Sequence, residues 1–72
     1  MKVLQTRIAD LRRTRNLSQI ELAEIVDVRR ETIARLEKGL YNPSLKLAYD
    51  IAHVFELPIE DVFQYVEVED DE

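Results

Sequence analysis

The segment from Ser18 to Gly39 constrains the fold of this 72-residue chain more than any other. Its sequence, SQIELAEIVDVRRETIARLEKG, predicts two short helices joined by a turn at Asp27-Val28. Ser18 and Glu21 have the spacing of a capping box, in which each side chain bonds the backbone N–H of the other residue. Gly39 stands where the second helix should end with a residue of positive φ. The spacing therefore predicts a helix pair with defined start, turn and end.

Length and composition predict one small domain that is not stabilised by disulfides. The chain is 46% apolar and contains no cysteine, so neither a disulfide framework nor a thiolate metal site supplements its core. Chains of this size are marginally stable, and association would bury further apolar surface. No secretory signal and no stretch of roughly 20 apolar residues is present. We therefore expect a cytoplasmic oligomer with no membrane association.

The net charge of −5 would argue against a nucleic-acid partner if it were evenly spread. Five of the fifteen acidic residues lie at the C-terminal end: Glu67, Glu69, Asp70, Asp71 and Glu72. Residues 1–66 are consequently neutral, and 12–38 carry seven basic against five acidic groups. A phosphate responds to the local field within a Debye length of roughly 8 Å. We divide the chain into a domain at 1–66 and an acidic tail at 67–72, which either stays disordered or competes with DNA for a basic surface.

The rest of the chain predicts an all-α fold of five helices with one short C-terminal strand. Helical periodicity covers residues 4–15, the segment from Ser18, about 30–38 and about 45–55, and a fifth helix starts at Pro58 and ends near Phe63. The pattern Tyr65-Val66-x-Val68 suggests a strand, for which residues 1–4 could be the partner. The residues expected to face the core are Leu4, Ile8, Leu11, Ile20, Ala23, Ile33, Leu36, Leu45, Ala48, Ile51, Ala52 and Phe55, with Leu22 and Val26 as further candidates.

Long polar side chains mark the face of the third helix opposite its apolar stripe. With a step of about 100° per residue, Glu31, Arg35 and Lys38 lie opposite Ile33 and Leu36. Arginine fits the O6/N7 edge of guanine through its bidentate fork, and glutamate can accept from cytosine N4. This arrangement suits a helix that enters the major groove of DNA. The alternative is an ordinary i,i+4 ion pair between Glu31 and Arg35 on a solvated face.

Three motifs resemble the phage-repressor, or Cro-like, helix-turn-helix family of transcriptional regulators, also called the xenobiotic-response-element type. The first is LSQIELA at 17–23, the second is TIARLEKG at 32–39, and the third is the loop YNPSL at 41–45. The resemblance covers about residues 5–64 and implies a five-helix bundle with its helix-turn-helix at 18–38. Two positions depart from the family pattern. Asp27 replaces the turn glycine, and Arg29 replaces the usual Ser/Thr cap of the third helix, which loses about 1 kcal/mol of capping.

The resemblance implies roles for individual residues. Gln19 would touch the DNA backbone and orient recognition-helix side chains, and Arg12 and Glu37 would form a structural ion pair. Arg30, Glu31, Thr32 and Arg35 fall at the base-reading positions. Arg13 and Arg15 would meet phosphates if they meet DNA at all. The full expected DNA-binding set is Ser18, Gln19, Arg29, Arg30, Glu31, Thr32, Arg35, Lys38, Tyr41, Asn42, Arg13 and Arg15. Tyr41 and Asn42 could donate to phosphates from the loop, or Asn42 could only shape the turn before Pro43.

The sequence thus predicts a sequence-specific DNA-binding regulator, a repressor that binds a palindromic operator as a homodimer. The expected dimer interface is Ile59, Val62, Phe63, Tyr65, Val66 and Val68. One alternative is the antitoxin of a toxin–antitoxin pair, whose protein partner would bind the C-terminal segment. Another is a protein-interaction module with the same fold. The residues give no catalytic pair, cofactor motif or metal cluster, because Ser18 is a helix cap and His53 shares a polar stripe with Lys46 and Asp50, so we expect neither an enzyme nor a cofactor.

Overall fold

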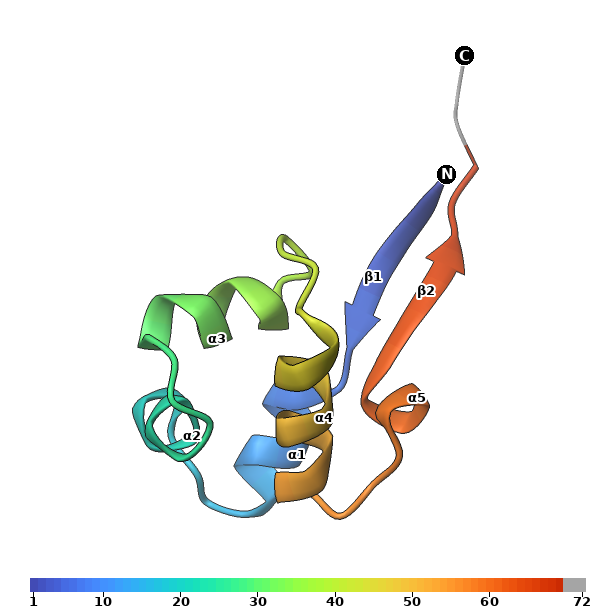
Figure 1. The fold of residues 1–72 in the computed structure, drawn as a ribbon. Coiled ribbons are helices and arrows are strands. Elements are labelled where there is room, and N and C mark those ends of the chain that lie inside the picture. The colour runs from blue at the N-terminus through green and yellow to red at the C-terminus, as the bar shows by residue number, and fades with distance from the viewer. Residues whose placement is uncertain (70–72) are drawn as a thin grey trace.

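Five helices pack around one apolar core, and a two-stranded antiparallel sheet projects from one side of them (Figure 1). The structure is a computed structural model that describes residues 1–69. In chain order the elements are β1 (Lys2–Thr6), α1 (Ile8–Thr14), α2 (Gln19–Ile25), α3 (Arg30–Glu37), α4 (Leu45–Val54), α5 (Ile59–Val62) and β2 (Phe63–Glu67). The five expected helices are present. The all-α description is corrected by the sheet, which joins the two ends of the chain.

The sheet pairs β1 with β2 from Lys2↔Glu67 to Thr6↔Phe63. The suggested partner strand is therefore confirmed, and it extends two residues further than expected. Leu4 belongs to β1, and its side chain is buried. The first helix therefore begins at Ile8 and not near residue 4. Glu67, expected to start the acidic tail, belongs to the sheet, where its carboxylate accepts a hydrogen bond from the N-terminal ammonium at 2.7 Å. Residues 70–72 of the expected tail lie outside the described residues.

Each of the five helices contributes to the centre of the core. The largest side chains with almost no exposed surface are Ile8, Leu22, Ile33, Leu36, Ile51 and Val62. Two expected core residues are exposed instead, Ile20 by 55% and Leu45 by 78%. Each lies roughly 100° from the middle of its helix's buried face on a helical wheel. The leucines that are buried in these helices are Leu22 in α2 and Leu47 in α4.

Two turns depend on positive φ angles. Asp27 has φ of 62° in the turn between α2 and α3, where Val28 N–H donates to Ala23 O at 2.9 Å. Aspartate is one of the few non-glycine residues that tolerate this conformation, so the departure from glycine is accommodated. Gly39 has φ of 71° after α3, and its N–H donates to Leu36 O at 3.0 Å. Both turns fix the ends of α3.

We expect Gly39→Ala to destabilise the protein by at least about 2 kcal/mol. A Cβ at this position would overlap the carbonyl oxygen of Leu4 in β1, and the positive φ is strained for alanine. Asp27→Gly is the matched comparison, because it relieves a positive φ and should leave stability unchanged or slightly higher. Urea denaturation of both variants measures the difference. Equal stability of Gly39→Ala and the wild type would contradict the close approach of α3's end to β1.

Candidate nucleic-acid interface

The helix α3 lies at the periphery of the bundle, with one side in the core and the other side exposed (Figure 1). Ile33 and Leu36 anchor it, since both have 0% exposure. The exposed residues of the segment are Arg29, Arg30, Glu31, Arg35 and Lys38, and Thr32 is half-buried. The structure thus brings the expected base-reading side chains to one exposed helix.

The exposed side of α3 does not neutralise itself. Among residues 1–69, the ion pairs do not include one between Glu31 and Arg35, although their spacing would allow it. Arg29 takes the N-cap position with extended backbone and makes no side-chain cap hydrogen bond. The Glu31–Arg35 ion pair of the alternative interpretation is therefore not formed in this part of the chain. None of the four cationic side chains of the segment, which are Arg29, Arg30, Arg35 and Lys38, forms an ion pair with a carboxylate of residues 1–69.

A largely buried ion pair joins α3 to α1. Arg12 Nε donates to Glu37 Oε2 at 2.8 Å, and Arg12 Nη2 donates to Glu37 Oε1 at 3.4 Å. The two side chains are only 12% and 9% exposed. Arg12 Nη1 also donates to Leu17 O at 3.0 Å, which satisfies a further donor of the guanidinium. The arrangement is bidentate, which is the strong geometry for arginine and carboxylate.

This ion pair extends through Gln19 to the exposed surface. Gln19 Nε2 donates to Glu37 Oε1 at 2.9 Å, and Gln19 Oε1 accepts from Arg30 Nη1 at 3.3 Å. Because the amide is bonded at both ends, its orientation is fixed. Arg30 is thereby tied to the core while its guanidinium lies at the start of α3.

Ser18 and Arg15 are engaged within the protein. Ser18 Oγ accepts the Glu21 N–H at 3.0 Å, and Glu21 Oε1 accepts the Ser18 N–H at 2.8 Å, so the predicted capping box is confirmed. These bonds hold the pKa of Glu21 below its ordinary value. Arg15 donates to the carbonyls of Val54 and Phe55 at 3.1 Å, and its guanidinium lies 5.8 Å from the Phe55 ring centre. Arg15 thus caps the C-terminal end of α4, and its expected phosphate contact stays a prediction. Arg13 is 69% exposed and lies 3.9 Å from Asp10.

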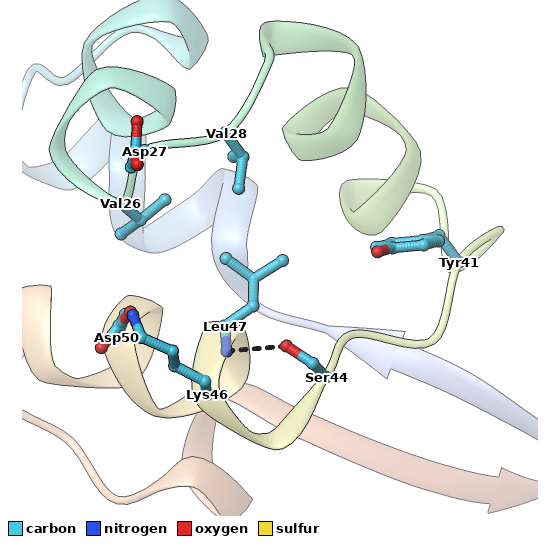
Figure 2. Close-up of a pocket in the computed structure, with 8 residues that line it drawn as sticks. All are labelled: Val26, Asp27, Val28, Tyr41, Ser44, Lys46, Leu47 and Asp50. Atoms are coloured by element: carbon cyan, nitrogen blue, oxygen red, sulfur yellow. Dashed lines mark hydrogen bonds and ion pairs between the residues drawn. The ribbon is translucent and has the colours of Figure 1, made fainter.

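The loop between α3 and α4 places its two candidate residues differently. Tyr41 lines a hollow of about 270 Å³ between the helix-turn-helix turn and the start of α4, with Val28 and Leu47 across from it (Figure 2). Asn42 is exposed, and its Oδ1 accepts from the Tyr65 hydroxyl at 2.9 Å. No local pattern in the sequence predicts this bond, because the two residues are 23 positions apart and meet only through the sheet.

The expected dimer residues lie in different parts of the structure. Val62 and Phe63 are 1% and 8% exposed in the subunit's own core, so their assignment to an interface is corrected. Tyr65 pairs with Leu4 in the sheet and therefore shares the face that meets the loop. Val66 pairs with Val3 on the opposite, outward face, and Ile59 is half-buried at a second hollow beside α4. Val68 follows β2 and is 39% exposed.

The described residues offer little for other chemistry. Within 1–69, no group of three His, Cys, Asp or Glu side chains could hold a metal ion. His53 stacks on Tyr49 with 5.8 Å between ring centres. No helix in this part of the chain is long and apolar enough to cross a bilayer.

Comparison with known proteins agrees with this geometry. The sequence profile HTH_3, described as helix-turn-helix, matches residues 8–62. The chain belongs to the helix-turn-helix family. An uncharacterized HTH-type transcriptional regulator of Archaeoglobus fulgidus is 59% identical over 66 residues, 92% of this chain and 93% of that protein. One of Methanocaldococcus jannaschii is 46% identical over 69 residues, 96% of this chain and all of that protein.

A solved structure matches the same fold. The restriction-modification controller protein C.AhdI from Aeromonas hydrophila superposes with a TM-score of 0.69 at 27% identity, over 76% of this chain and 83% of that one. The resemblance to Cro-like regulators is confirmed, and the helix-turn-helix regulators are DNA-binding proteins of a non-enzymatic class.

We expect Glu37→Ala to cost about 3–5 kcal/mol of stability, because Arg12 would remain buried without its partner. The same change should release Gln19 and, through it, Arg30. Glu24→Ala on the exposed side of α2 is the control and should change stability by less than about 0.5 kcal/mol. Urea denaturation gives both values. If the two variants unfold alike, the Arg12–Glu37 pair does not hold α1 and α3 together.

Proposed function

We propose that this helix-turn-helix protein is a sequence-specific transcriptional repressor that binds a palindromic operator as a homodimer. The observation that carries the proposal is the exposed side of α3, where Arg30, Arg35 and Lys38 stand without an internal carboxylate partner. Such a helix end matches the base edges and phosphates of a major groove. The similar proteins of Archaeoglobus fulgidus and Methanocaldococcus jannaschii are named as HTH-type transcriptional regulators, which supports the regulatory role.

The side chains of α3 divide by position into two roles. Arg30, Glu31 and Arg35 occupy the first two turns, which reach base edges when a recognition helix enters the groove. Lys38 is the C-cap residue and lies nearer the loop, where a phosphate is the natural partner. The hydrogen bond from Arg30 to Gln19 limits the rotamers of Arg30. Arg30 therefore loses less conformational entropy when it binds a base.

The outward face of the sheet supports the homodimer. It carries Val3 and Val66 as a cross-strand pair, followed by Met1 and Val68 at the open end of the sheet. Met1 and Val68 are 64% and 39% exposed. The Gln5–Gln64 pair lies on the same face, nearer the bundle. A second copy related by a two-fold axis would cover the apolar part of this face with the same residues, as isologous interfaces require. Two half-sites about 34 Å apart, one helical turn, would then suit the two α3 helices.

Repression follows from occupancy. A bound dimer excludes other proteins from the operator it covers, whereas activation requires an additional favourable contact with the transcription machinery. We therefore infer repression, which requires DNA binding alone.

We expect Arg35→Ala and Lys38→Ala to weaken DNA binding in different ways. Loss of Arg35 should cost roughly 1–3 kcal/mol on a selected operator and relax the preference at one base position per half-site. Loss of Lys38 should weaken all sequences alike and reduce the salt dependence by about one ion per subunit. Selection from random duplexes, followed by binding at several salt concentrations, measures both effects. A wild type that prefers no sequence would leave the protein-interaction module as the better description.

We expect Val66→Glu to dissociate the dimer, because a charge would be buried between two sheets. Ile25→Glu is the matched control, since Ile25 is an apolar residue of α2 that is 58% exposed and lies outside the sheet. Sedimentation at micromolar concentration should give a dimer for the wild type and Ile25→Glu, and a smaller species for Val66→Glu. A monomeric wild type, or a Val66→Glu variant that stays fully dimeric, would show that the sheet is not the interface.

A further inference from the structure

The two-stranded sheet touches the end of α3 and its following loop at three places. Thr6 Oγ1 in β1 donates at 3.4 Å to Leu36 O, which lies in the last turn of α3. Gly39 lies so close to the carbonyl of Leu4 that a side chain would not fit between them. Tyr65 in β2 donates through its hydroxyl to Asn42 Oδ1 at 2.9 Å. In Figure 1 the loop rises beyond α3 and runs beside β1.

Of these contacts, the one between Tyr65 and Asn42 is exposed and polar on both sides. An exposed hydrogen bond contributes little to stability, because water can replace either partner. It does favour one orientation of a primary amide, which has an acceptor at one end and two donors at the other. With Oδ1 held by Tyr65, the Asn42 amide presents its NH₂ group as the unengaged end.

We propose that Tyr65 is a positioning residue for DNA binding, whose hydroxyl holds Oδ1 of Asn42 so that the Asn42 NH₂ group donates to a backbone phosphate. The inference rests on the proposed function, because it assumes that α3 enters a major groove. The loop follows the C-terminal end of α3, and contacts away from the first turns of a recognition helix go mainly to phosphates. A phosphate oxygen only accepts hydrogen bonds, so it requires the NH₂ end of the amide.

The same geometry assigns the two faces of the sheet to different partners. Leu4, Tyr65, Thr6 and Phe63 share the face toward the core and the loop, whereas Val3 and Val66 share the outward face. Tyr65 can therefore act on the loop without forming part of the proposed dimer surface. This separation allows the two roles to be tested independently.

The experiment is a double-mutant cycle of Tyr65→Phe and Asn42→Ala, with Tyr49→Phe as control. Tyr49 is a tyrosine of α4 with similar exposure, 57% against 56% for Tyr65. Asn42 is not among the residues with positive φ, so alanine suits its backbone. Binding is measured on a selected operator and on a scrambled duplex, and sedimentation and thermal unfolding verify that each variant remains a folded protein with the oligomeric state of the wild type.

We expect Asn42→Ala to weaken binding to both duplexes by the same factor, about three- to tenfold per subunit. Tyr65→Phe should weaken both by about two- to fivefold with an unchanged salt slope, because no charge is lost. The double variant should bind no more weakly than Asn42→Ala alone, and Tyr49→Phe should bind like the wild type.

Two results would overturn the inference. One is a Tyr65→Phe variant that binds both duplexes as tightly as the wild type; if that variant also loses stability or association, the bond has a purely structural role. The other is losses that multiply in the double variant. If the wild type binds neither duplex, the proposed function itself fails, and the positioning role falls with it.

Discussion

The largely buried pair of Arg12 and Glu37 is the interaction on which the DNA-facing part of the structure depends. Removing two charges from water is costly, and here four hydrogen bonds made by these two side chains, with each other, with Gln19 and with the Leu17 carbonyl, offset that cost. Since the pair joins α1 to the last turn of α3, it fixes the rotation of α3 about its axis. The bond through Gln19 then carries that constraint to Arg30. A surface arginine is thereby positioned by an ion pair in the interior.

The sheet supplies the second constraint on α3. Its inner face meets the end of the helix at Leu36 and Gly39 and reaches the loop through Tyr65, while its outer face carries Val3 and Val66. The bundle therefore holds the start of α3 through α2, and the sheet holds its end. A surface that binds DNA needs such support at both ends, because misplacement by a fraction of an ångström weakens several contacts at once.

Local patterns accounted for most of the helices and their boundaries. The capping box at Ser18 and Glu21, the turn at Asp27 and the stop at Gly39 act within a few residues of each position, so their signals are contained in the sequence. Ile20 and Leu45 were predicted to face the core, but both are exposed. A helical period alone does not show which of several apolar residues at the edge of a stripe is buried. Val62 and Phe63 were predicted to lie at an interface, but both side chains are buried in the core.

By itself the sequence determined the helix pair at 18–38, the apolar stripe of α3 and the identity of its exposed side chains, because these follow from the periodicity and capping of adjacent residues. Only the tertiary structure decided which polar groups meet across long separations. Arg15 bonds the end of α4. Tyr65 of β2 bonds Asn42 of the loop. Such contacts depend on how the elements pack in three dimensions, and a hydrogen bond between residues 20 to 40 positions apart leaves no local pattern in one sequence.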